Sequence, residues 1–409
     1  MKKIKSILQV FANKRMFIVL VNGFTSGVPL ALTAGTLQAW MKDKNVDLTT
    51  IGIFSLVGIP YTLKFLWAPV MDRFVPAFLG RRRGWLLISQ IALAFFIAMM
   101  AFAKPLESPF MLAFLAVLVA FSSASQDIVI DAYRTEILNP EELGVGAGTY
   151  IMGYRIGMLV SGAVALILAD HFSWKSVYLI MSGTIVIGIL MTFFSPEPKV
   201  REKPPKTLSE AVILPFVDFL KRKGSLELLA FILFYKLDVI MTMALMTPFL
   251  MQIEFSKSDI GYVLKGFGLV ATIVGSLVGG AWMVRLGMKK SLWVFGLLQG
   301  FSGLSFVLLS YLGHNYVMMI TALTLENLCS GMGTAVFSAF LMHLCNQKFT
   351  ATQYALLTSF MALSRVFMSA PCGYVAEQFG WHAYYIVSVL IAIPGLMLLT
   401  RYDQWQKTA

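Results

Sequence analysis

Charge, cysteine and histidine are scarce in this chain, and each shortage excludes a class of function. Only 13% of the 409 residues are charged, whereas 58% are hydrophobic and the mean hydropathy is +0.75. Soluble domains carry about 25% charged residues, so this composition excludes a soluble globular protein and indicates a helical membrane protein. A membrane β-barrel would show short alternating segments. The apolar runs here are long and continuous instead.

The three cysteines and four histidines point to no redox, metal or catalytic chemistry. Cys329, Cys345 and Cys372 show no paired spacing and fall in apolar segments. We therefore expect neither a disulfide nor a metal site, and assign them to packing. The histidines are scattered, and no catalytic constellation is recognisable. We expect no enzyme, and no cofactor beyond a proton gradient.

Basic residues outnumber acidic ones by 33 to 21, and their placement follows a membrane topology rather than nucleic-acid binding. Most lie in the termini, the central linker and the loops of one side. The other side holds only Lys42, Lys44, Lys104, Lys175 and Lys257. The positive-inside rule therefore predicts a multi-pass protein of a bacterial inner membrane with both termini in the cytoplasm. We expect the first span to be an uncleaved anchor.

Twelve apolar segments are long enough to span a membrane as a helix, which takes about 20 residues. They form two sets of six, in domains 1–194 and 228–409, joined by a Pro- and Lys-rich linker at 195–227. Within the linker, 208–220 has the pattern of an amphipathic helix on the inner membrane face, with a solvated linker as the alternative. The predicted spans are 16–40, 48–70, 84–104, 109–135, 144–169, 174–194, 228–252, 258–285, 290–312, 315–345, 351–376 and 381–400.

The two sets of helices repeat each other in parallel. Tyr154-Arg155 of the fifth span matches Ser364-Arg365 of the eleventh, and residues 172–178 match 379–385. A parallel repeat of six plus six helices predicts an all-α membrane protein with the major facilitator fold. In that fold the substrate site lies between the two halves, near the middle of the membrane.

Two carboxylates stand inside the fourth predicted span. Asp127 and Asp131 are four residues apart and share a helix face. A charge near the centre of a membrane helix costs roughly 2.5–3.5 kcal/mol, so a pair indicates an ion or substrate pathway. Proton coupling and a static bracing network are the two interpretations. Ser338 replaces Asp131 in the repeat, so the fold does not require the carboxylates, which favours proton coupling.

Other polar and aromatic side chains inside the spans are candidates either for the substrate cavity or for bracing between helices. Arginines there remain protonated, so they serve as anion clamps or structural counter-ions. Tyrosine rings could stack on sugars. The candidates are Asn22, Thr25, Gln38, Tyr61, Lys64, Gln126, Tyr150, Tyr154, Arg155, Lys236, Asp238, Lys265, Glu326, Asn327 and Arg365.

The loop after the second span resembles the cytoplasmic loop of major facilitators, in which an aspartate and an arginine pair across helix ends as a gate. Asp72, Arg73 and Arg81 are its candidates, although Arg81 could simply anchor the topology. Arg285 occupies the corresponding loop of the second half, which lacks the aspartate.

Three parts of the N-terminal half resemble the AmpG-type muropeptide permeases: 23–33, 63–73 together with 79–85, and the fourth-span motif Gln126-Asp127-Ile-Val-Ile-Asp131-Ala-Tyr-Arg134. The C-terminal half resembles them more loosely. The resemblance implies proton-driven import of N-acetylglucosaminyl-1,6-anhydro-N-acetylmuramyl peptides, in peptidoglycan recycling and, in some bacteria, β-lactamase induction. By the same matching, Asp127 and Asp131 carry the family's intramembrane carboxylates and are the candidates for proton coupling, with the choice between them left open.

The expected partners are therefore a sugar-peptide solute, protons and the lipid bilayer, with no nucleic acid and a monomeric protein. Several members of the resembled family have further C-terminal helices, whereas this sequence stops after the twelfth predicted span. This departure leaves another large solute, such as a siderophore or an acyl-CoA, as the alternative cargo.

Overall fold

A computed structural model describes residues 13–199 and 204–406, apart from some side chains within 48–55, 257–265 and 362–371. The described part is built from helices, without a strand. Nine of its helical segments are long and apolar enough to cross a membrane. The three remaining predicted spans correspond to the interrupted second segment, to α19 (Tyr316–Leu344) and to the first part of α20 (Thr350–Leu390).

The N-terminal half follows the first six predicted spans, and three of these are interrupted. The second span is divided by 3₁₀ turns, and the fifth contains a π-helical turn. The first span consists of two helical segments separated by a break at Ala34, and Pro29 lies inside the first of them. The elements are α2 (Lys14–Leu32), α3 (Gly35–Asp43), α4 (Leu48–Ile53), η1 (Phe54–Gly58), α5 (Ile59–Leu63), η2 (Lys64–Leu66), α6 (Ala68–Arg73), α7 (Arg81–Met100), α8 (Pro109–Ile137), α9 (Leu143–Leu159), η3 (Val160–Val164), α10 (Ala165–Ala169) and α11 (Trp174–Phe194).

The C-terminal half repeats this order after α12 (Leu208–Leu220), the helix of the linker. Its eleventh and twelfth spans run into one another, and Gly380, with φ +77°, makes the turn between them. The other elements are α13 (Ser225–Phe234), α14 (Leu237–Ala244), α15 (Met246–Gln252), α16 (Lys257–Tyr262), η4 (Val263–Phe267), α17 (Gly268–Leu286), α18 (Met288–Leu312), α21 (Ala392–Leu398), η5 (Leu399–Arg401) and α22 (Tyr402–Gln406).

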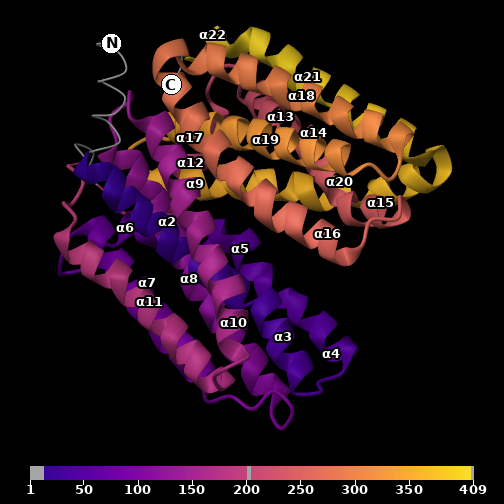
Figure 1. Ribbon diagram of the computed structural model, residues 1–409. Helices are drawn as coiled ribbons and strands as arrows, with labels where there is room; N and C mark the ends of the chain where they lie inside the picture. The colour runs from indigo at the N-terminus through magenta and orange to yellow at the C-terminus, as the bar shows by residue number, and fades with distance from the viewer. Residues whose placement is uncertain (1–12, 200–203, 407–409) are drawn as a thin grey trace.

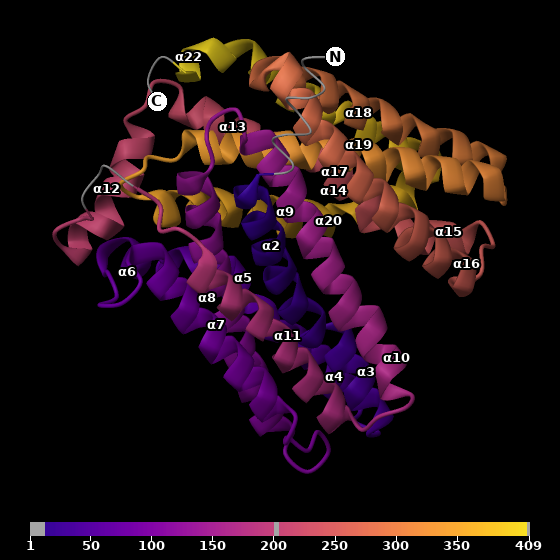
Figure 2. The same ribbon diagram turned by 60° about the vertical axis from the view of Figure 1, so that its left-hand side comes forward.

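The two halves form inclined bundles that meet at one end (Figures 1 and 2). The N-terminal turns of α9 pack against the C-terminal turns of α17. A Cβ on Gly280 would lie 2.3 Å from the carbonyl oxygen of Gly144. The start of α20 contacts α6 and α8 at the same end. In both views the α3–α4 end of one bundle and the α15–α16 end of the other lie apart. By the predicted topology, the contact end faces the cytoplasm.

Backbone contact between α2 and α9 positions the interior of the N-terminal half. A Cβ on Gly27 would lie 2.1 Å from the carbonyl oxygen of Tyr154, and one on Gly153 would lie 2.1 Å from that of Leu20. Small residues four apart on both helices permit this approach, as is usual in membrane helix pairs. The approach brings Ser26 of α2 beside Tyr150 of α9, with their hydroxyl oxygens 2.8 Å apart.

Candidate functional site: a carboxylate network joined to the cytoplasmic contact

Asp127 and Asp131 lie on α8 in different surroundings. Asp127 is partly exposed and accepts a short hydrogen bond from the Ser26 hydroxyl. Asp131 is buried and contacts two cations: its Oδ2 lies 3.4 Å from Lys64 Nζ, and its Oδ1 lies 2.8 Å from an amino nitrogen of Arg134. One carboxylate therefore has a neutral partner, and the other has two charged ones.

Arg134 joins this network to the opposite half. Its side chain is 3% exposed, and its guanidinium donates a short hydrogen bond to the hydroxyl of Tyr354 on α20. The guanidinium carbon also lies 4.3 Å from the ring centroid of Tyr150 and 5.1 Å from that of Tyr354. Such placement over aromatic faces is favourable for a desolvated cation. Tyr354 also contacts Ser338 of α19, with hydroxyl oxygens 3.1 Å apart.

Ser338, the counterpart of Asp131 in the repeat, thus meets the same arginine through Tyr354. The N-terminal half contributes the carboxylate and the C-terminal half contributes two hydroxyls. The repeat has placed both positions near the contact between the halves, and different side chains give them different chemistry.

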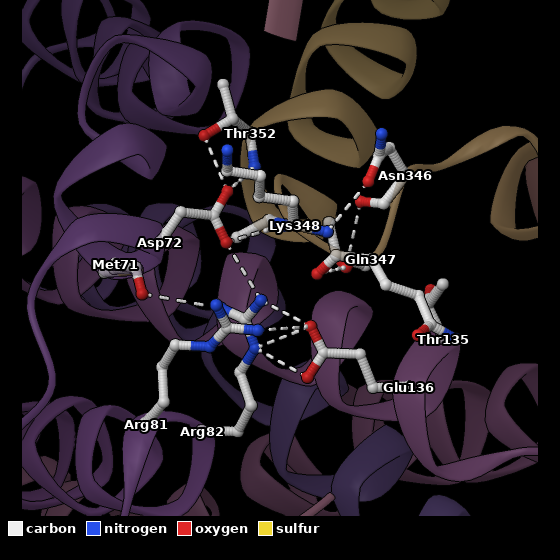
Figure 3. Close-up of polar contacts among 12 residues, drawn as sticks. Met71, Asp72, Arg81, Arg82, Thr135, Glu136, Asn346, Gln347, Lys348 and Thr352 are labelled. Carbon is white, nitrogen blue, oxygen red and sulfur yellow. Dashed lines mark hydrogen bonds and ion pairs between the residues drawn. The ribbon is translucent and has the colours of Figure 1, made fainter. Parts of the chain in front are cut away.

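Asp72 makes a second contact between the halves, drawn in Figure 3. Its Oδ2 accepts from the backbone N–H and the hydroxyl of Thr352, both at 2.8 Å. Its Oδ1 lies 2.9 Å from Arg82, which also contacts Glu136 of α8 at 2.5 Å. Asp72, Arg82 and Glu136 are almost completely buried, so the hydrogen bonds must compensate their desolvation.

Three of the four predicted gate residues take other positions. Arg81 contacts Glu136 at 3.2 Å instead of Asp72. Arg73 stacks on the neighbouring Phe74 ring, and Arg285 is exposed at the end of α17. The carboxylate of Glu197 caps the first turn of α7, where it accepts from the backbone N–H of Arg82 at 2.8 Å, and Arg82 is the residue of this turn that reaches Asp72.

The cavity candidates of the N-terminal half divide by exposure. Asn22, Thr25 and Gln126 are buried between helices, and Thr25 packs against Gly188 of α11. The side-chain amide of Gln126 has no hydrogen-bond partner among the described residues. A second group keeps part of its surface accessible in this conformation, consisting of Gln38, Tyr61, Tyr150, Tyr154 and Arg155.

The candidates of the C-terminal half mostly take part in contacts between helices. Lys236 donates to Gln299 Oε1 at 2.6 Å, and Glu326 accepts from Ser302 at 2.7 Å. Asp238 is buried, and Asn327 accepts from Thr272 at 3.0 Å. The backbones of Lys265 and Arg365 belong to η4 and α20, but their side chains lie outside the described part.

Ser26, Arg82, Glu136, Thr352 and Tyr354 complete these two networks, and none was among the sequence candidates. Hydroxyl residues are frequent in membrane helices, so Ser26, Thr352 and Tyr354 carry no individual signal. Arg82 stands in a run of three arginines, and only the position of Glu197 and Asp72 distinguishes it.

Comparison with known proteins places the chain in a family. The Major Facilitator Superfamily model matches residues 16–369 and again 228–407. The chain is 48% identical over 394 residues to the anhydromuropeptide permease of Escherichia coli K12, covering 96% of this chain and 80% of the permease. An uncharacterized protein of Haemophilus influenzae is 39% identical, with 96% and 95% covered.

The fold agrees with this relationship. The structure of a proton:xylose symporter of the same superfamily, bound to 6-bromo-6-deoxy-D-glucose, superposes with a TM-score of 0.70 at 12% identity, covering 96% of this chain and 95% of the symporter. The fold predicted from the repeat is thereby confirmed, and the similarity to a permease bears out the prediction of a transporter rather than an enzyme. The chain is a multi-pass membrane transporter of the major facilitator superfamily and belongs to the family of the anhydromuropeptide permease.

Proposed function

We propose that the protein imports anhydro-muropeptides from the periplasm to the cytoplasm, coupled to protons, as a step of peptidoglycan recycling. The 48% identity along almost the whole chain with the E. coli anhydromuropeptide permease carries the choice of cargo. Further parts of the proposal are the bacterial inner membrane, cytoplasmic termini, a monomer and no bound cofactor. The distribution of Lys and Arg supports the orientation.

We infer that Asp127 exchanges the proton. Protonating Asp131 would weaken its contacts with two cations. Hydrogen bonds between charged groups are stronger than those between neutral ones, so this protonation is costly. Protonating Asp127 leaves its neutral Ser26 partner able to reorganise, because a hydroxyl can either donate or accept. Asp127 is also the more exposed of the two. Asp131 then serves to hold Arg134 in place.

A proton on Asp127 reverses the direction of donation in the short chain of hydrogen bonds that joins Asp127, Ser26 and Tyr150. With Asp127 ionised, Ser26 donates to the carboxylate, and Tyr150 donates to Ser26. With Asp127 protonated, the acid donates to Ser26, and Ser26 donates to Tyr150. The Tyr150 ring lies beside Arg134, which bonds across to Tyr354. Loading the proton thus changes the surroundings of a contact that holds the cytoplasmic ends together.

The accessible aromatic and basic side chains suit a solute made of sugar and peptide. Tyr61, Tyr150 and Tyr154 offer ring faces for sugars, and the latter two rings lie 6.2 Å apart. Arg155, on the next position of α9, offers a permanent cation for a carboxylate of the peptide. We propose that these residues contact the cargo in the outward-open state.

Uptake into right-side-out membrane vesicles tests the proposal. Labelled anhydro-muropeptide should accumulate when the outside is acidic, and the accumulation should collapse when the pH gradient is removed. Asp127→Asn should abolish accumulation but retain exchange of labelled for unlabelled solute, because exchange needs no net proton movement. Equal accumulation in wild type and Asp127→Asn would refute the coupling. Wild-type vesicles that neither accumulate nor exchange the solute would refute the cargo.

A further inference from the structure

The linker helix α12 is fixed to the start of α20 by one of its faces. Ala211, Pro215 and Phe219 are buried, at the spacing of one helix face. Asp218 accepts from Gln353 Nε2 of α20 at 2.7 Å and from Arg222 at 2.7 Å. Burial alone raises the pKa of Asp218, but these hydrogen bonds outweigh it and hold the pKa below its usual range.

A second face of α12 is apolar and exposed. Its side chains have between 41% and 53% of their surface accessible, and they are Leu208, Val212, Ile213, Phe216 and Leu220. An apolar stripe of this size on a membrane protein marks a surface that faces lipid or a partner. Figure 2 shows α12 at the periphery of the bundles, near α6 and the start of α20.

An apolar groove runs beside this stripe. It has a volume of about 150 Å³ and lies between α12, α13 and α20, where Phe216, Leu220, Leu229, Leu356 and Phe360 line its wall. Its lining is almost entirely hydrocarbon. Such a groove favours a chain of methylene groups over any polar solute.

A basic cleft of about 360 Å³ adjoins the end of the same helix. Lys221, Arg222 and His343 line it together with Asp218, whose charge is matched by Arg222. Lys221 and the neighbouring Lys223 are exposed. Lys221, which lines the cleft, directly follows Leu220, which lines the groove, so positive charge stands next to the apolar lining. Basic residues at the end of an amphipathic helix are the usual arrangement for anionic lipid.

We propose that the groove and the cleft together bind one anionic phospholipid of the inner leaflet. An acyl chain lies in the groove against Phe216 and Leu220, and the phosphate lies at Lys221 and Lys223. The apolar groove supplies affinity for the tail, and the lysines distinguish an anionic headgroup from a zwitterionic one. The site lies on the outer surface of the C-terminal half, separate from the Asp127 network, so it is independent of the proposed cargo.

Native mass spectrometry of the detergent-purified protein tests this site. The full chain is titrated with phosphatidylglycerol and, separately, with phosphatidylcholine of the same acyl chains. We expect one phosphatidylglycerol to be retained in preference to phosphatidylcholine. The double variant Lys221→Gln/Lys223→Gln should weaken that retention about 10-fold or more. Lys289→Gln/Lys290→Gln, with the same charge change in the first turn of α18 in the same half, should retain wild-type binding.

Three further arms make the result decisive. Phe216→Ser should weaken phosphatidylglycerol retention without changing the lysines. Excess inorganic phosphate or glycerol phosphate should fail to displace the lipid, because neither has a tail. Equal retention of both lipids, unchanged retention in the Lys221/Lys223 variant, or displacement by phosphate alone would overturn the proposal. Unchanged melting temperatures of the surface variants exclude unfolding as the cause of any loss.

Discussion

The hydrogen bond between Arg134 and Tyr354 should help to hold the two halves together at their contact, and Tyr354→Phe removes it. The same change also removes the contact of the Tyr354 hydroxyl with Ser338, but that contact lies within the C-terminal half. The phenyl ring still fits the space 5.1 Å from the guanidinium carbon. A hydrogen bond to a charged group contributes about 1.5–3 kcal/mol net of water. Since each 1.4 kcal/mol is about tenfold, the ratio of inward-open to outward-open molecules should rise about 10- to 150-fold.

Electron–electron double resonance between spin labels can measure this shift. Suitable positions are Phe78, exposed in the loop after α6, and Lys290, exposed on α18 in the other half. Tyr178→Phe is the matched control, because its buried hydroxyl donates to the carbonyl of Leu32 within one half. Tyr354→Phe should enlarge the population with the longer label distance, and the control should not. Identical distance distributions in the two variants would refute the idea that the bond between Arg134 and Tyr354 holds the two halves together.

Three other predictions concern stability. Arg82→Met removes the cation that Asp72 and Glu136 share, which leaves Asp72 without an ion-pair partner, and should cost about 3–5 kcal/mol of unfolding free energy in chemical denaturation. Arg73→Met, which loses only a ring contact, should change little. Gly27→Val should lower the melting temperature strongly, because a Cβ would overlap the opposite backbone, and Gly183→Ala should be tolerated, because nothing lies within 4 Å. The pKa of Asp218 is lower in the folded state than in the unfolded chain, so its charge stabilises the folded state at pH values above the unfolded pKa. The docking of α12 should therefore weaken as pH falls below about 4, and hydrogen exchange of α12 measures this loss. Equal stability of the two arginine variants, wild-type melting of Gly27→Val, or pH-independent exchange of α12 would each contradict the corresponding argument.

Hydrophobic patterning predicted the helices closely, because length and apolarity are local properties of the chain. The segments Pro109–Ile137 and Trp174–Phe194 fall within two residues of the predicted spans. The interruptions in the second and fifth spans were not predicted. Breaks such as the π turn at Val160–Val164 depend on how the helix packs against neighbours. Gly162 lies in that turn, but Gly153 and Gly157 lie in regular helix just before it, so glycine alone does not locate the break.

Partners of buried charges could not be predicted in the same way. Helical spacing correctly identified a shared face for Asp127 and Asp131, and the pairing of Asp131 with Arg134 follows from the same i, i+3 geometry. The contacts of Asp127 with Ser26, of Asp72 with Arg82 and Thr352, and of Lys236 with Gln299 each join different helices. Helix crossing and rotation determine these contacts, and neither is encoded in spacing along one helix.

By itself, the sequence determined the membrane class, the two six-helix halves and the presence of costly carboxylates in the fourth span, because each follows from the transfer of side chains between water and lipid. Only the tertiary structure decided that Arg82, rather than Arg81, meets Asp72, and that Arg134 reaches Tyr354 across the halves. The physical reason is distance. Residues separated by 220 positions become neighbours only when the glycine contacts of α9 and α17 bring one end of each bundle together.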